Sequence, residues 1–133
     1  VYGYDMRDPY PSESSYFDKN RGVAGMASED GRVVLNPFSS LAPHERDAVA
    51  RNEASRLYMR ETRPNFDWDP TPDQQRSFAG TAYASDPENM RHTIIARILS
   101  GDPSAGAVTP RQQEWADWMK SALESRGNPP RDY

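Results

Sequence analysis

The two histidines, His44 and His92, are the first side chains to consider for catalysis or metal binding. Neither belongs to an HExxH motif or to another two-histidine metal spacing, and only the fold could bring them together. We interpret each as a solvated or hydrogen-bonded histidine. A concave pocket that held either one beside a carboxylate would instead favour a hydrolase.

Carboxylates are numerous, but their spacing predicts no site. Asp67, Asp69 and Asp73 fall near the first ligand positions of a calcium-binding loop. Pro72, however, stands where that loop needs a glycine, and Phe78 stands where it needs a bidentate glutamate. The glycines form no phosphate-binding loop, and no GxSxG serine motif occurs. The sequence therefore predicts no catalytic residue, no metal ligand and no cofactor, and we do not expect an enzyme.

Composition excludes several further classes. The chain has no cysteine, which removes disulfides, thiolate catalysis and thiolate zinc sites. A net charge of -4 and a pI near 5.1 argue against a protein that neutralises phosphates, so nucleic acid is an unexpected partner. No apolar run approaches the roughly 20 residues that a membrane span needs, and residues 1–11 do not resemble a signal peptide. We expect a soluble protein with no membrane partner.

The clearest charged feature is a row of arginines within a predicted helix. A proline at the first helical position and Glu45 in the first turn predict a helix over residues 43–62. Arg56, Arg60 and Arg63 recur along one face of it, at i, i+4 and i+7. Acidic neighbours dilute this row, so it is either a solvated face with weak ion pairs or a charged interface.

Three more helices follow from caps and apolar spacing. Thr71 with Gln74 forms a capping-box pattern, and Thr109 with Gln112 repeats it. The helix between them runs from a cap at residue 85 or 86 to the left-handed terminator Gly101. We interpret the two similar starts as two similar caps and not as an internal repeat, because the apolar positions after them do not align.

Apolar residues are dense enough to found a core only between residues 85 and 123. Trp115 and Trp118 lie at helical spacing there, and we expect both in the core. If one of the two rings were exposed, it would be an interface anchor. Phe66 and Trp68, in the loop before the second helix, are expected to insert into the same core.

The predicted fold is mainly α: a small bundle of about four short helices with a short β-hairpin and an extended N-terminal arm. Residues 23–27 and 32–35 flank a turn that contains Gly31 and form the hairpin. Two strands alone are marginal in water, so the hairpin must lie on the helices or join another sheet. We divide the chain into the arm (1–22), the helical domain with its hairpin (23–127) and a C-terminal tail (128–133).

The predicted arm has no helical or alternating period but is rich in aromatic residues. They are Tyr2, Tyr4, Tyr10, Tyr16 and Phe17. Disordered segments normally lack aromatic residues, so the arm is expected to dock. It could dock back onto its own domain or onto a neighbouring chain, where tyrosine is a frequent anchor.

Two stretches of the helical domain resemble small helical proteins encoded by tailed bacteriophages and prophages. They are the run Phe78-Ala79-Gly80-Thr81-Ala82-Tyr83 and the segment from Ile94 to Gly106, followed by Thr109-Pro110. The resemblance covers about half of the chain and leaves out the arm. It implies a virion-associated or phage-encoded accessory role and carries over no active site.

We therefore expect a non-enzymatic structural or adaptor protein that binds the protein subunits of a larger assembly through its aromatic arm. The resemblance makes that assembly a phage virion, formed in the host cytoplasm, and a homo-oligomer is compatible with this role. Deleting residues 1–22 should then leave the helices folded but abolish assembly. The alternative is a small phage-encoded inhibitor or regulator that docks on a host enzyme or nucleic-acid machine and uses the arginine row as complementary charge.

Overall fold

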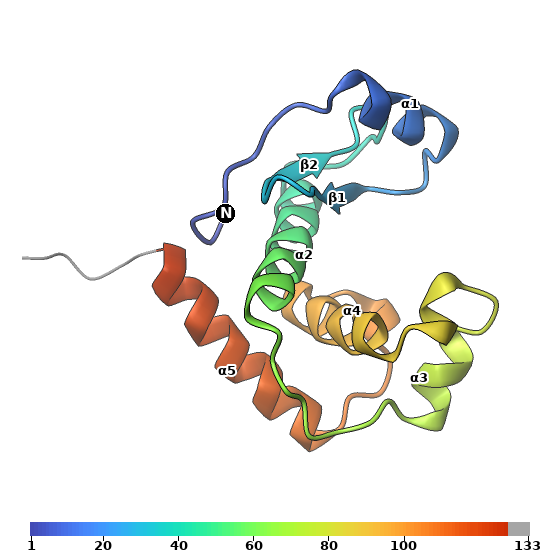
Figure 1. Ribbon diagram of the computed structural model, residues 1–133, viewed down its shortest axis with the longest axis vertical. Helices are drawn as coiled ribbons and strands as arrows, with labels where there is room; N and C mark the ends of the chain where they lie inside the picture. Colours follow the sequence, from blue (N-terminus) through green and yellow to red (C-terminus); the bar gives the residue numbers. More distant parts are fainter. Residues whose placement is uncertain (128–133) are drawn as a thin grey trace, which may run out of the picture.

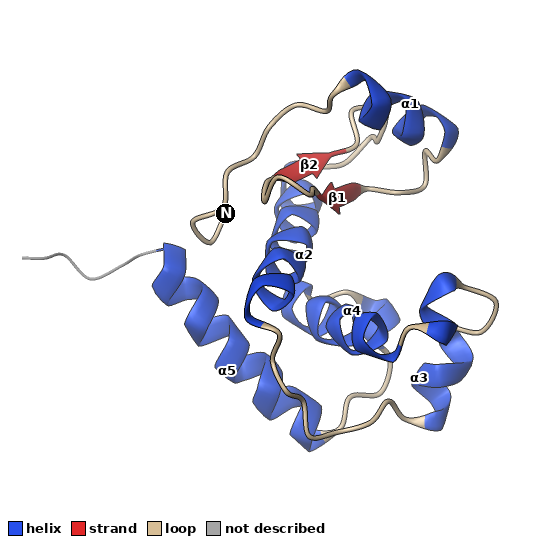
Figure 2. Ribbon diagram, viewed as in Figure 1, coloured by secondary structure: helices blue, strands red, loops and turns tan. Residues whose placement is uncertain are grey.

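The central element of the fold is α2 (Pro43–Thr62), the longest helix within the described residues (Figure 1). The computed structural model describes residues 1–127, and the predicted tail, 128–133, lies outside them. The remaining elements are α1 (Pro11–Lys19), β1 (Gly25–Ala27), β2 (Val33–Leu35), α3 (Pro72–Ser77), the 3-10 helix η1 (Ala82–Ser85), α4 (Pro87–Ser100), the 3-10 helix η2 (Pro103–Ala105) and α5 (Pro110–Gly127). The predicted mainly helical bundle with a short hairpin is thus confirmed (Figure 2).

Both strands and α4 pack against α2, and α5 packs against α4. The core lies between these elements and contains apolar side chains from each of them. Trp68 inserts into it from the loop before α3, as expected. Trp118 does not: 57% of this residue is exposed, and only Trp115 of the pair is partly buried. The expectation that both rings lie in the core is therefore wrong for Trp118.

The starts of α3 and α5 are joined through their capping boxes. Thr71 Oγ1 accepts from the Gln74 N–H at 3.1 Å, and Gln74 Oε1 accepts from the Thr71 N–H at 2.9 Å. Thr109 and Gln112 form the same pair of bonds, each 3.2 Å long. The two glutamine amides then exchange hydrogen bonds of 2.7 and 2.8 Å and are buried. Each glutamine therefore caps its own helix and holds the start of the other.

The hairpin is antiparallel, with Met26 opposite Val34, and it does not stand alone. Residues 5–7 run along the far side of β2. The Val33 N–H donates to the Asp5 carbonyl at 2.9 Å, and the Arg7 N–H donates to the Val33 carbonyl at 3.1 Å. The hairpin thus gains support from both sides, because α2 covers its face and this segment covers one of its edges.

The N-terminal segment has no helix up to Tyr10, but residues 11–19 form α1. Pro11 occupies the first helical position, and the Glu13 carboxylate accepts from the Tyr10 N–H at 2.8 Å. Only Phe17 of the nine residues in α1 is buried, so the helix has no apolar stripe. The predicted arm without a helical period is therefore wrong over α1.

Residues 1–4 fold back onto the end of α5. The Tyr4 N–H donates to the Val1 carbonyl at 2.9 Å and closes a turn in which Tyr2 and Gly3 both have positive φ. A Cβ on Gly3 would lie 3.0 Å from the carbonyl oxygen of Arg126, so only glycine fits there without displacing the helix end. We call this contact between residues 1–4 and the end of α5 the terminal latch.

Candidate functional site

The five aromatic residues of the N-terminal segment fall into two groups. Tyr4 and Phe17 are buried and Tyr2 is half-buried, whereas Tyr10 and Tyr16 are 53% and 47% exposed. Phe17 and Tyr4 therefore dock onto their own chain. Tyr10 and Tyr16 are the two of the five that a partner could contact.

Tyr4 is held by two charged side chains. Its hydroxyl donates to Glu61 Oε2 at 2.9 Å, and the Arg126 guanidinium lies 4.0 Å from the centre of its ring. Burial, together with the carboxylate of Glu61, raises the pKa of Tyr4. Tyr4 is thus a neutral structural residue that ties the N-terminal segment to α2 and α5.

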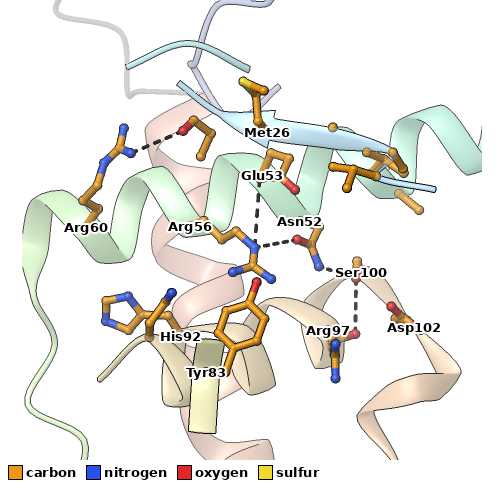
Figure 3. A pocket seen from close by; sticks show the side chains of 18 of the residues that line it. Met26, Asn52, Glu53, Arg56, Arg60, Tyr83, His92, Arg97, Ser100 and Asp102 are labelled. Carbon is orange, nitrogen blue, oxygen red and sulfur yellow. Dashed lines mark hydrogen bonds and ion pairs between the residues drawn. The ribbon is translucent and has the colours of Figure 1, made fainter. Parts of the chain in front are cut away.

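An open groove with a volume of about 1220 Å³ lies between the hairpin and α4 (Figure 3). One side of α2 lines it, together with residues 23–27 at and before β1. The opposite side comes from α4 and the short helices η1 and η2, and Tyr16 of α1 stands at its edge. Segments that are far apart in the sequence therefore line the same groove.

The predicted arginine row lines this groove, but two of its members are engaged within the chain. Arg56 Nε donates to Asn52 Oδ1 at 3.0 Å (Figure 3). Its Nη1 donates to Thr93 Oγ1 at 2.9 Å. Arg60 donates to the carbonyls of residues 27 and 28 at the end of β1. Arg63 follows α2 in the left-handed conformation and is exposed. The row therefore joins α2 to α4 and to the hairpin.

His92 also lines the groove, and His44 is exposed on α2. His92 is buried, and its Nε2 lies 3.9 Å from Glu88 Oε1 without a hydrogen-bond partner among residues 1–127. Burial lowers the pKa of His92, which Glu88 partly opposes. Glu53, another residue that lines the groove, is half-buried, and burial raises its pKa. A histidine beside a carboxylate in a concave site is the arrangement that would favour a hydrolase.

The only serine that lines the groove is not arranged as a nucleophile for His92. Ser100 Oγ donates to the Arg97 carbonyl at 3.3 Å and accepts from Asn52 Nδ2 at 3.3 Å (Figure 3). Its proton is thus directed at the backbone of its own helix. The ring of His92 instead meets Phe66 edge to face, with 6.2 Å between the ring centres.

Arginines hold two exposed aromatic side chains on the N-terminal lobe, by which we mean residues 1–38. The Arg7 guanidinium lies 3.8 Å from the centre of the Tyr10 ring, and the Arg21 guanidinium lies 4.9 Å from that of Phe38. Arg7 also pairs with Glu13 at 2.7 Å and with Asp30 at 2.9 Å. The sequence does not reveal these contacts, because Arg7 reaches residues 6 and 23 positions away.

Hydrogen bonds from Ser28 and Arg7 lower the pKa of Asp30 to about 2. Asp30 therefore keeps its negative charge at neutral pH, and Arg7 stays paired beneath the Tyr10 ring. The exposed Tyr10 ring thus rests on a guanidinium that is itself held by two carboxylates.

In the part of the chain that the structure describes, no group of three or more histidine, aspartate or glutamate side chains is placed to hold a metal ion. None of the helices within residues 1–127 is long and apolar enough to cross a membrane. Comparisons with family models, with curated proteins and with solved structures found no match to this chain.

Proposed function

We propose that the protein is a non-enzymatic structural or adaptor protein whose N-terminal lobe binds a polypeptide of a larger assembly. One observation carries this proposal: the large exposed apolar side chains gather on that lobe. Within residues 1–127, four of these five side chains belong to the lobe: Met6, Tyr10, Tyr16 and Phe38. The fifth, Trp118, lies on α5. Single exposed apolar residues are common on any protein, but several on one lobe are typical of an interaction surface.

The state of these side chains supports the same proposal. Tyr10 and Phe38 are each covered on one face by an arginine that holds the ring in place. A fixed ring loses little conformational entropy on binding, which is why aromatic residues frequently supply most of the energy of an interface. The assembly that we propose is a phage particle, on the strength of the resemblance of residues 78–83, 94–106 and 109–110 to phage-encoded helical proteins.

A hydrolytic function is less well supported than binding, although His92 lies in the groove beside Glu88. General base catalysis needs the base within hydrogen-bond reach of the group that it activates. Ser100 directs its hydroxyl at a backbone carbonyl, and the ring of His92 packs against Phe66. These contacts are typical of a histidine that contributes to packing.

Site-specific photocrosslinking tests the proposal. A photoreactive phenylalanine analogue replaces Tyr10 or Tyr16 in separate variants, which are produced in the organism that encodes the chain. Ser121, which is exposed on α5 and does not belong to the lobe, is the matched control position. We expect both tyrosine positions, but not Ser121, to crosslink to one and the same protein. The absence of a crosslink specific to Tyr10 and Tyr16 would overturn the proposal.

The same experiment separates the adaptor from the alternative inhibitor. A crosslinked particle subunit supports the structural role, and a crosslinked host enzyme supports the inhibitor. Binding by an inhibitor that uses the arginine row should weaken strongly as salt is raised, because exposed charge pairs are screened. Arg56 and Arg60 already donate within the chain, so we expect the crosslink to change little with salt.

A further inference from the structure

The hydrogen-bond pattern of the hairpin turns the backbone groups of two residues of β1, Gly25 and Ala27, away from β2. The Asn36 N–H donates to the Ala24 carbonyl, and the Ser28 N–H donates to the Arg32 carbonyl, both at 2.9 Å. In an antiparallel ladder, hydrogen-bonded and non-hydrogen-bonded pairs alternate. Gly25, opposite Leu35, is therefore a non-hydrogen-bonded position. Its N–H and its carbonyl both point away from β2.

The other backbone groups at this edge are already occupied. Arg60 donates to the Ala27 carbonyl at 3.3 Å, and the Ala27 N–H bonds to the Glu53 carboxylate. The Val23 N–H donates to the Asn20 carbonyl at 2.9 Å, and the Val23 carbonyl accepts from Asn36 Nδ2 at 2.7 Å. Within residues 1–127, the backbone groups of Gly25 receive no such partner.

A free donor and a free acceptor on one edge residue are the recognition chemistry of a polypeptide backbone. An extended segment laid along β1 offers one residue whose carbonyl and N–H match Gly25. Its side chain would point to the same side as a Cβ on Gly25, which would lie 3.0 Å from Val49 Cγ1 of α2. Leu41, Ala48 and Val49 line the groove on that side, so the matching side chain must be apolar.

The position of the β1 edge decides whether its occupant is a single extended segment or a second copy of this chain. Residues 23–27 are half-buried and form one wall of the groove, opposite α4 (Figure 3). Two such recessed strands in two copies cannot meet edge to edge, because the other wall of each groove stands between them. A single extended segment needs only the space of the groove itself.

We propose that the groove takes up an extended segment of the partner protein, which adds to β1 as a third strand and exchanges two hydrogen bonds with Gly25. The segment carries an apolar side chain opposite Gly25. This inference rests on the proposed function, because it names the way in which the partner is bound. Tyr16 belongs to both sites, because it is one of the exposed side chains of the N-terminal lobe and also lies at the edge of the groove.

The probe that tests it is a random library of 12-residue peptides, selected on the whole chain. Variants at Gly25 itself are unsuitable, because any side chain there would meet Val34 O and Val49 Cγ1 at 3.0 Å. Ala48→Arg instead places a long side chain in the groove, and Ala122→Arg makes the same change at a half-buried position of α5 that does not line it. Circular dichroism melts establish that both variants fold.

If the segment adds as a strand, Ala48→Arg weakens the selected peptide by about tenfold or more, and Ala122→Arg leaves it unchanged. N-methylation of the one peptide residue whose N–H donates to Gly25 weakens the affinity of the peptide by about tenfold, whereas N-methylation of either neighbouring residue does not. Hydrogen exchange of the Gly25 amide slows in the complex. Exchange of the Val33 amide, already bonded to the Asp5 carbonyl, stays the same.

Three results would overturn the inference. In the first, peptides bind in the groove, but N-methylation does not weaken their binding and the exchange of the Gly25 amide does not slow. The crosslinks at Tyr10 and Tyr16 can then still stand, and with them the proposed function. In the second, no selected peptide is sensitive to Ala48→Arg, so the groove is not the receptor. In the third, light scattering detects a dimer that Ala48→Arg dissociates, which makes a second copy the occupant.

Discussion

At the scale of single residues, burial decides the behaviour of His92. The side chain sits in the core-facing part of α4, and its Nε2 has no hydrogen-bond partner within the described residues. A neutral imidazole tolerates this position better than a charged one, because desolvation penalises the charged form. The pKa of His92 is lowered for this reason, even though Glu88 lies 3.9 Å away.

We expect this histidine to make the protein less stable in mild acid. The unfolded chain binds the proton first, near the ordinary pKa of 6.5, because the folded pKa is lower. The free energy of unfolding is therefore highest above that value, and it falls as the pH drops through the window between the unfolded and the folded pKa. Urea denaturation between pH 8 and pH 5 measures this fall.

His92→Gln is the control variant, since it removes the titrating group, and its stability should change less over the same pH range. In NMR titrations the Cε1 proton of His92 should move with a midpoint below 6.5. A midpoint above 6.5 would mean that Glu88 outweighs burial, and it would contradict the prediction.

The residue scale is also where prediction from the sequence was least complete. Trp115 and Trp118 are three positions apart, so their directions on a helix differ by only about 60°. Such spacing places both near the apolar stripe but does not tell which one lies at its margin. In the structure, the Trp115 ring packs edge to face against Phe66, with 4.9 Å between the ring centres, and its Nε1 donates to the exposed Asp67 at 2.7 Å. Asp67 comes from a distant loop, so no local pattern reveals the contact.

At the scale of elements, helices with strong end signals were predicted well. The bounds expected from proline, caps and glycine agree closely with α2, α4 and α5. Phe78 ends α3 early, and Gly80 follows with φ of +79°, so the second predicted helix is split into α3 and η1. α1 was missed because its stability comes from Glu13, Arg7 and one buried ring rather than from an apolar stripe.

The buried glutamine pair predicts a measurable coupling between α3 and α5. Gln112→Leu removes the partner of the Gln74 amide and half of the capping box at Thr109. We expect it to lower the free energy of unfolding by about 2 to 4 kcal/mol, since a buried polar group loses its partner and a helix loses a cap. Chemical denaturation measures this loss.

The double variant Gln74→Leu/Gln112→Leu completes a double-mutant cycle. Its cost should be smaller than the sum of the two single costs by about 1 to 3 kcal/mol, because neither amide is then left unpaired. Costs that add to within about 0.5 kcal/mol would mean that the two caps act independently.

At the scale of the whole molecule, the N-terminal segment belongs to the folded body. Tyr4 lies in the core cluster, and residues 5–7 pair with β2. The sequence predicts that removal of residues 1–22 leaves the helices folded. The contacts of Tyr4 and Phe17 now lead us to expect that the same deletion destabilises the protein.

Two tyrosines separate the structural from the binding part of this segment. Tyr4→Ala removes a buried ring and should lower the free energy of unfolding by about 3 to 5 kcal/mol. Tyr10→Ala removes an exposed ring and should change it by less than about 1 kcal/mol. Thermal and urea unfolding of the two variants provide the comparison, and equal losses would contradict the division of the segment into a packed and an exposed part.

The terminal latch has a consequence for synthesis on the ribosome. Tyr4 and Arg126, which stack in the folded protein, are 122 residues apart in the chain. At about 5 to 20 residues per second, translation takes roughly 6 to 25 s to cover that distance. During this interval the nascent chain lacks the Arg126 guanidinium that covers the Tyr4 ring and the end of α5 that packs against Gly3. Residues 1–4 therefore leave the exit tunnel well before the part of α5 that covers them.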